Sequence, residues 1–149
     1  MSEKKVLAVA SGGGHWKQLM LLREAFAANQ VKYVTTIDGL PQQNQIEDFV
    51  IVKDSNKDKK LDLLITLFQL LKVIYTYKPN TIISTGAAPG LMALFIGRIF
   101  GAKTIWVDSI ANSEQLSFAG RLARVVAHQV LSQWQELSDN KVMYKGSLY

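Results

Sequence analysis

The residues near the N-terminus that are best suited to chemistry are three consecutive glycines followed by a histidine. Ser11, Gly12, Gly13, Gly14 and His15 come directly after a short apolar segment. Glycines allow positive φ and let the backbone approach a ligand closely, and the unpaired N–H groups at a helix start attract anions. We therefore expect this loop to bind a phosphate or diphosphate group, with an ordinary tight βα turn as the alternative.

The glycine loop matches neither of the common nucleotide-binding motifs. A dinucleotide fingerprint would place its third glycine where Trp16 or Lys17 stands. A Walker loop needs Gly-Lys-Ser/Thr, which the sequence does not contain. Asp38 could imitate the acid that binds a ribose, but Gly39 follows it and completes a pair typical of a turn. A nucleotide-dependent redox enzyme is therefore not expected.

Two further loops contain small or polar residues that could complete a phosphate site. Their candidate ligand-binding residues are Thr85, Gly86, Gly90, Asp108 and Ser109. Each loop follows a segment typical of a buried strand, and parallel strands end at the same edge of a sheet. These two loops and the glycine loop are therefore expected to converge on one crevice.

His15 and Asp108 are the candidates for catalysis. His15, at a helix start, is expected to act as a general base or to donate a hydrogen bond to phosphate, because the positive helix end favours a neutral imidazole. Asp108 is an alternative base, a partner that orients His15, or only a cap for the loop that follows it. These alternatives stay open on the sequence. His128, the other histidine, is expected to be a packed structural residue.

Strands and helices are predicted to alternate through residues 1–149, which indicates a single α/β domain with an open, mostly parallel sheet. Hydrophobic patterning places strands at 6–10, 31–36, 49–52, 81–84, 104–107, 130–132 and 142–144. It places helices from the glycine loop to about residue 28 and at 61–77, 91–100 and 118–127. Residues 38–45 are expected to form a polar loop, and residues 85–90 a turn.

The helix predicted at 61–77 has more apolar surface than contact with one face of a sheet requires, because its polar residues project within roughly a third of a turn. Phe68, Leu71, Lys72 and Tyr75 are expected to meet a membrane surface or a partner. Burial by neighbouring helices of the same domain is the alternative. A transmembrane span is not expected, because the run is short and carries a polar stripe.

The charge pattern favours an acidic partner. The 149-residue chain has a net charge of +5, and Lys57, Lys59 and Lys60 belong to a basic segment that could contact lipid headgroups. Nucleic-acid binding is not expected, because aromatic residues are not interleaved with basic ones.

Other residue types are absent or sparse, and this excludes further classes. With no cysteine and only two, well-separated histidines, neither a disulfide framework nor a metal centre is expected. The charged residues 1–5 do not form a signal peptide, which indicates a cytoplasmic chain.

Six blocks of residues, in the same order, resemble those of one protein family. They lie at 11–19 (Ser-Gly-Gly-Gly-His-Trp-Lys-Gln-Leu), 78–86 (Lys-Pro-Asn-Thr-Ile-Ile-Ser-Thr-Gly), 106–112, 120–122, 133–136 and 144–147. The resemblance that they carry extends over nearly the whole chain. They are similar to blocks of the membrane-anchor subunit of asparagine-linked glycosylation and of its bacterial exopolysaccharide and capsule counterparts.

The resemblance implies a Rossmann-like domain equivalent to the N-terminal half of a GT-B glycosyltransferase. Such a subunit binds a lipid-diphosphate-linked acceptor at the inner face of the cell membrane, while a separate subunit, equivalent to the C-terminal half, binds the UDP-sugar. The implied reaction transfers N-acetylglucosamine or another hexose in polysaccharide or lipid-linked oligosaccharide synthesis and needs no cofactor. The alternative is a non-catalytic membrane adaptor that recruits and stabilises the catalytic subunit.

The chain departs from the family pattern at two positions. Asp108 stands where the family usually has Glu, which keeps the carboxylate but shortens its reach. Asn112 stands where the family usually has Arg, which removes a cation that could pair with phosphate or with Asp108. Either departure could reflect a different acceptor, and Asn112 remains a candidate substrate-binding residue.

Overall fold

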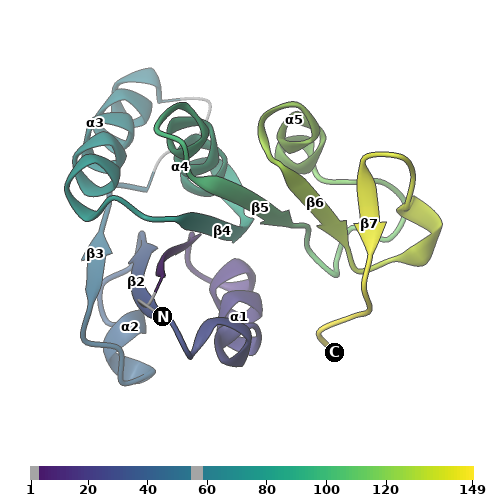
Figure 1. Ribbon diagram of the computed structural model, residues 1–149, viewed down its shortest axis with the longest axis horizontal. Helices are drawn as coiled ribbons and strands as arrows, with labels where there is room; N and C mark the ends of the chain where they lie inside the picture. Colours follow the sequence, from purple (N-terminus) through teal and green to yellow (C-terminus); the bar gives the residue numbers. More distant parts are fainter. Residues whose placement is uncertain (1–3, 55–58) are drawn as a thin grey trace.

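The computed structural model describes residues 4–54 and 59–149, which form a seven-stranded sheet flanked by helices (Figure 1). The strands lie in the order β3-β2-β1-β4-β5-β6-β7, and every neighbouring pair is parallel. Their bounds are β1 Lys5–Ala10, β2 Gln30–Thr35, β3 Phe49–Ile51, β4 Thr81–Gly86, β5 Lys103–Val107, β6 Gln129–Ser132 and β7 Val142–Tyr144. The α/β class and the open parallel sheet expected from the sequence are confirmed.

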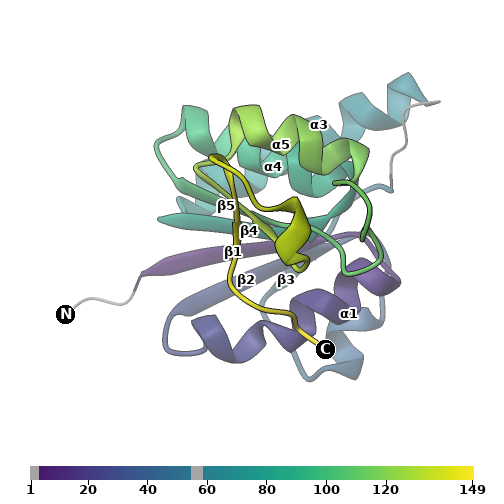
Figure 2. The same cartoon turned by 90° about the vertical axis from the view of Figure 1, so that its right-hand side faces the viewer.

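Helices cover both faces of the sheet (Figure 2). One face carries α3 (Lys60–Tyr77), α4 (Ala87–Ile99) and α5 (Phe118–Val126). The other carries α1 (Gly14–Leu21), the 3-10 turn η1 (Arg23–Phe26) and the short α2 (Leu40–Gln43). A second 3-10 turn, η2 (Gln135–Leu137), precedes β7.

The central strand β1 is buried on both faces, which explains why its sequence is a continuous apolar run. Leu7 and Val9 belong to the core between the sheet and the α3–α4 layer, with Leu70 of α3. Ala8, on the opposite face of the strand, belongs to the core beneath the sheet, with Trp16 of α1. Because helices cover both faces of the sheet at its centre, a ligand can reach the sheet at its edges.

The first helix is shorter than expected, and the loop after β2 is more ordered. The helix expected to reach about residue 28 ends at Leu21, because the N–H of Leu22 bonds the carbonyls of both Gln18 and Leu19 (3.2 and 3.1 Å) and tightens the chain into η1. Residues 38–45 contain α2, whose start is fixed by Gly39 (φ 101°) and by the Gln42 side chain, which accepts the Gly39 N–H at 3.0 Å.

The turn expected at 85–90 is replaced by a two-residue corner. β4 continues through Gly86, and α4 begins at Ala87. The backbone turns through φ 152° at Gly86 and 72° at Ala87. A positive φ is unfavourable for an alanine, so the chain stores strain at this carboxyl-terminal corner of the sheet.

The basic segment expected to contact lipid is described only in part. Lys57 lies outside the described residues, whereas Lys59 and Lys60 are exposed at the start of α3.

Candidate functional site

The loops after β1 and β4 meet at the carboxyl edge of the sheet through His15 and Thr85. The Nδ1 atom of His15 lies 3.2 Å from the carbonyl oxygen of Thr85, and the Thr85 hydroxyl donates to the carbonyl of His15 at 2.6 Å. These two bonds fix the start of α1 to the end of β4. The imidazole thus lies at the carboxyl edge of the sheet, where the order of the loops predicts a crevice.

The Thr85 carbonyl determines the tautomer of His15. A carbonyl oxygen can only accept, so the hydrogen bond requires a proton on Nδ1. In the neutral ring, Nε2 then carries the free lone pair. Nε2 makes no hydrogen bond to a residue that the structure describes, and the side chain is half-buried. This tautomer therefore leaves His15 with one ring nitrogen, Nε2, that can accept a hydrogen bond or a proton.

Gly86 provides the space that the imidazole occupies. A Cβ atom at Gly86 would lie 2.1 Å from His15 Nδ1. The φ of 152° at Gly86 is also one that residues with a side chain rarely adopt. Gly86 is thus required by both its conformation and its contact with His15.

The three glycines of the first loop have different roles. A Cβ at Gly12 would lie 2.1 Å from the Ile37 side chain, and the Gly12 N–H donates to the Thr36 hydroxyl at 3.3 Å, so Gly12 serves packing against the loop after β2. Gly13, with φ 74°, is the N-cap of α1. Gly13 and Gly14 are exposed, and no described atom lies within 4 Å of a Cβ built on either. Their backbone is open to an approaching anionic group.

The Asp108 carboxylate is buried and fully engaged by its own loop. Its side chain accepts hydrogen bonds from Trp106 Nε1 (3.0 Å), the hydroxyl and N–H of Ser117 (2.7 and 3.0 Å) and Asn112 Nδ2 (3.4 Å). Ser117 in turn caps α5 by accepting the Gly120 N–H at 2.8 Å. These contacts correspond to the loop-capping alternative for Asp108, and they assign Asn112 to the same cap.

Asp108 and His15 are not joined by a hydrogen bond within the described part of the chain. The nearest connection between their loops runs through Gln18, which sequence reasoning missed. Gln18 is 3% exposed; its Nε2 donates to Ser109 Oγ (3.0 Å), and its Oε1 accepts from the Ile110 N–H (3.2 Å).

Gln133, the first residue after β6, completes this buried network. Its amide donates to Gln18 Oε1 and, at 3.0 Å, to the Asp108 carbonyl. The Trp134 indole donates to the Ile110 carbonyl at 2.7 Å. Both glutamines lie in blocks singled out on the sequence, but their pairing across 115 residues has no local signature.

The remaining candidate residues are placed as follows. Ser11 and Ser109 are half-buried at the carboxyl edge, and the Ser109 hydroxyl is held by Gln18. Gly90 is not in a loop; it is buried in α4, where a Cβ would lie 1.9 Å from Ser84 Oγ. The contact of Gly90 with Ser84 lets α4 pack closely on β4, so its position supports packing rather than ligand binding.

The outward side of α3 is apolar, as expected, with one correction. Phe68 and Tyr75 are 67% and 66% exposed, and Lys72 is exposed between them. Leu61 and Leu64 extend this apolar side toward the start of the helix. Burial of these side chains within the domain, the alternative considered on the sequence, does not occur.

Leu71 is the exception, because it is half-buried and packs against the core. Across the described residues, no helix combines the length and hydrophobicity needed to cross a membrane.

Solved structures share this fold at low sequence identity. Acinetobacter baumannii MurG superposes with a TM-score of 0.78 at 14% identity, covering 95% of this chain and 45% of its own. A UDP-N-acetylglucosamine 2-epimerase from Rickettsia bellii gives 0.73 at 11%, covering 98% and 45%. A glycosyltransferase from Rickettsia africae gives 0.70 at 10%, covering 98% and 43%. The chain thus spans less than half of each of these structures. Among curated proteins, none matches the sequence significantly.

The strand order, the glycine loop and these superpositions define the class: a Rossmann-like domain resembling the N-terminal half of a GT-B glycosyltransferase. Within this class, residues 46–148 match the family described as "Oligosaccharide biosynthesis protein Alg14 like". The chain belongs to this Alg14-like family, in agreement with the resemblance seen in its sequence blocks.

Proposed function

We propose that this chain is the acceptor-binding, membrane-docking subunit of a two-component glycosyltransferase. The enzyme transfers N-acetylglucosamine or another hexose from a UDP-sugar to a lipid-diphosphate-linked acceptor, and a separate GT-B C-terminal-type subunit binds the UDP-sugar. Membership of the Alg14-like family supports oligosaccharide biosynthesis, and the likeness to one half of MurG supports the division of the site between two domains.

The acceptor diphosphate is held at the start of α1. The exposed backbone at Gly13 and Gly14 and the positive end of the helix provide N–H donors and a partial positive charge for it. The strained corner at Gly86 and Ala87 forms the opposite wall of this crevice. In this proposal, the acceptor sugar lies beside His15.

His15 acts as the general base, and its geometry is the observation that carries the proposal. As the acceptor hydroxyl attacks the anomeric carbon of the donor, its proton passes to Nε2 of His15. The bond between that carbon and the UDP oxygen breaks, and UDP leaves with its electron pair. Nδ1–H, bonded to the Thr85 carbonyl, holds the ring in the tautomer that accepts the proton.

Asp108 is a positioning residue in this proposal. Its four hydrogen-bond donors keep the loop 109–117 and the start of α5 in place, and through Ser109 this loop contacts Gln18 of α1. Gly120 leaves room for this carboxylate, because a Cβ at Gly120 would lie 2.5 Å from it.

Reconstitution of the complex with substituted His15 tests this function. The chain is combined with a UDP-sugar-binding partner subunit, and transfer of labelled sugar to a lipid-diphosphate acceptor is measured. We expect His15→Ala to lower turnover by roughly two to four orders of magnitude, as loss of a general base does, with partner binding retained. His128→Ala, at the opposite edge of the sheet, is the control and should turn over normally.

Normal turnover by His15→Ala would move the catalytic base to the partner and make this chain a membrane adaptor. Robust transfer by the chain without any partner would contradict the two-component arrangement.

A further inference from the structure

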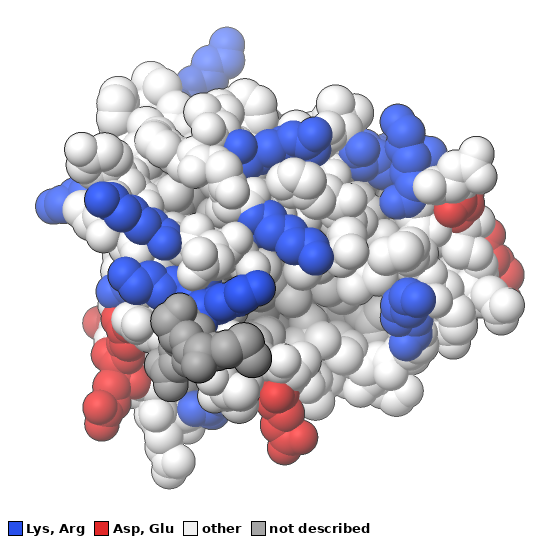
Figure 3. Space-filling model, viewed as in Figure 1, with Lys and Arg blue, Asp and Glu red and all other residues white. Residues whose placement is uncertain are grey.

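The amino edge of the sheet, opposite the crevice, is rich in cations. Lys5 begins β1, Lys78 precedes β4, Lys103 begins β5 and Lys141 precedes β7. Figure 3 looks onto this edge and shows Lys and Arg side chains spread over it, with acidic side chains toward its rim. Among the described residues, none of these four lysines forms a salt bridge with a carboxylate.

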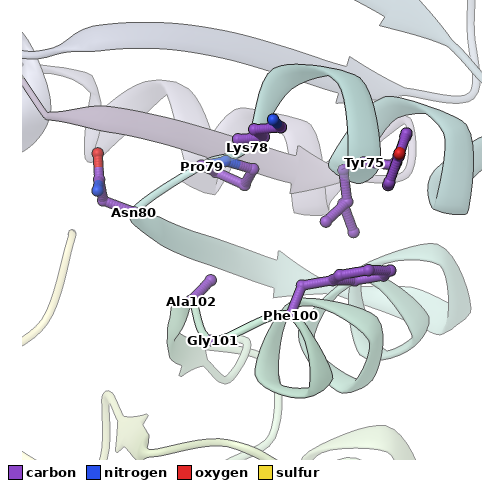
Figure 4. A pocket seen from close by; sticks show the side chains of 8 residues that line it. Tyr75, Lys78, Pro79, Asn80, Phe100, Gly101 and Ala102 are labelled. Carbon is purple, nitrogen blue, oxygen red and sulfur yellow. The ribbon is translucent and has the colours of Figure 1, made fainter.

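A cavity of about 400 Å³ opens at this edge, between the C-terminal ends of α3 and α4 (Figure 4). Its volume falls in the range of about 300–1,000 Å³ that is usual for small-molecule sites. Tyr75 of α3 and Phe100, just after α4, form an apolar wall, with their rings edge to face at 6.4 Å. Both side chains are more than half exposed, so this wall is accessible from outside.

The polar side-chain groups that line the cavity favour an anion. Lys78 is the only charged residue among those lining it in the described chain. The Asn80 Oδ1 atom accepts the Lys5 N–H at 2.8 Å, which leaves the Asn80 NH₂ group as a donor. The N–H groups of Gly101 and Ala102 bond carbonyls of the last turn of α4, which reduces the negative character of that helix end.

Lys78 occupies a position at which glycine would be less strained. It ends α3 in the left-handed conformation, with φ 55°, and its N–H donates to the Ile74 carbonyl at 2.9 Å. Helices that end in this conformation usually have glycine or asparagine there, because other residues cost free energy. Lys78 thus keeps an unfavourable backbone conformation at the mouth of a cavity, which suggests a functional role for its ammonium group.

We propose that this cavity binds one anionic phospholipid of the membrane, with the phosphate at Lys78 and Asn80 and the upper acyl chain along Tyr75 and Phe100. The proposal rests on the membrane docking proposed above. Tyr75 lies on the same side of α3 as Phe68, seven residues earlier, so the apolar side of the helix leads into the cavity. The Lys78 ammonium disfavours choline lipids, because their zwitterionic headgroup brings a second cation close to it.

Monomeric short-chain lipid tests the site without a membrane. Short-chain phosphatidylglycerol, kept below its micelle-forming concentration, is titrated into the isotope-labelled full chain and followed by nuclear magnetic resonance. We expect saturable shifts at Tyr75, Lys78 and Phe100, and weaker binding of the matched phosphatidylcholine. Equal affinity for the two lipids would overturn the proposal, and so would equal affinity for inorganic phosphate alone.

Lys78→Gly is the decisive variant, because glycine accepts the left-handed conformation and the variant therefore folds. We expect it to bind phosphatidylglycerol about fivefold more weakly, the effect of one basic residue near an anionic lipid. Lys103→Gln, at the same edge but outside the cavity lining, should keep the original affinity. Unchanged binding by Lys78→Gly would refute the site.

The failure of this site can be distinguished from the failure of membrane docking. Phe68→Glu is expected to lose binding to phosphatidylglycerol vesicles while keeping the affinity for the monomeric lipid. If Phe68→Glu still binds vesicles and monomeric lipid binding persists, docking by α3 is wrong and the lipid site stands. If monomeric lipid does not bind but Phe68→Glu abolishes vesicle binding, the site is wrong and docking stands.

Discussion

A single backbone carbonyl decides which nitrogen of His15 is available in the crevice. Thr85 lies at the end of β4, and its carbonyl takes the proton-bearing Nδ1 of the ring. The neighbouring Asp108, which the sequence makes an equally eligible base, has both oxygens occupied by donors of its own loop. The two candidates therefore differ in the atoms that the described residues leave free for a substrate, which His15 has at Nε2 and the Asp108 carboxylate lacks.

Gln18 is the residue whose substitution should loosen the crevice without touching His15. Gln18→Leu keeps the volume but leaves Ser109, the Ile110 N–H and the Gln133 amide without their partner. We expect a loss of about 2–3 kcal/mol in the free energy of unfolding, the cost of leaving buried polar groups unpaired. Denaturant unfolding measures this loss.

The loop 109–117 should also become less protected when Gln18 is substituted. Hydrogen exchange at the Ile110 amide is expected to accelerate in Gln18→Leu. Gln115→Leu, an exposed substitution in the same loop, is the matched control and should change neither quantity. Equal stability of the two variants would show that the buried glutamine network does not hold the loop.

At the scale of elements, the last turn of α3 is fastened to the sheet by Tyr77. Its hydroxyl group lies 3.3 Å from the carbonyl of Val6 and 3.1 Å from that of Gln30, to which it donates. Burial raises the pKa of Tyr77 to about 12, and the Asp48 carboxylate adds to the effect. The Tyr77 hydroxyl group thus links the end of α3 to the starts of β1 and β2.

The raised pKa of Tyr77 makes this attachment sensitive to alkali. The unfolded tyrosine has a pKa near 10.0, so between that value and about 12 the folded chain binds more protons than the unfolded one. The stability it contributes is present below pH 10 and is lost as the pH rises through about 12. Buried Tyr33 adds in the same sense, because burial raises its pKa as well.

Tyr77→Phe should therefore change the alkaline limb of the stability profile. We expect it to cost about 1 kcal/mol at neutral pH, the value of one hydrogen bond, and to flatten the decline in stability above pH 10. Urea unfolding at a series of pH values gives both quantities. The exposed Tyr149→Phe should retain the full decline. A parallel decline in Tyr77→Phe would assign the alkaline sensitivity to other groups.

The sequence predicts the strands well, because helices cover both faces of the central strands and these accordingly read as apolar runs. It fails at the start of α4. Small residues suit a turn and a tightly packed helix equally, and the positive φ at Ala87 that lets α4 begin at once is not visible in composition.

The candidate site is predictable in part. Glycines and a histidine after a strand reveal the first loop, but the Gln18–Gln133 pair is created only by the three-dimensional arrangement.

At the scale of the whole molecule, the α3 face is proposed to rest on the membrane. Phe68→Glu is expected to abolish flotation with anionic liposomes, because it places a charge in the centre of the exposed apolar side. Lys59, Lys60 and Lys72 each add about 1 kcal/mol near an anionic surface, so raised salt should weaken binding.

Leu21→Glu is the matched control for docking. Leu21 is 50% exposed at the end of α1, on the other side of the sheet, and its substitution should leave flotation unchanged. If Phe68→Glu floats like the wild type while remaining folded, the apolar side of α3 belongs to a protein partner instead.

The course of α3 across the sheet has a consequence for how substrate is found. The helix has 18 residues, about 27 Å at 1.5 Å per residue, and it starts at the carboxyl edge and ends at the amino edge. In the proposed docking along this helix, the carboxyl edge from which α3 starts stays close to the bilayer surface. The proposed acceptor would then reach the carboxyl edge by diffusing within the plane of the membrane, and its search would have two dimensions instead of three. The rate of transfer would follow the surface density of the acceptor among the lipids, whatever its concentration in the surrounding volume.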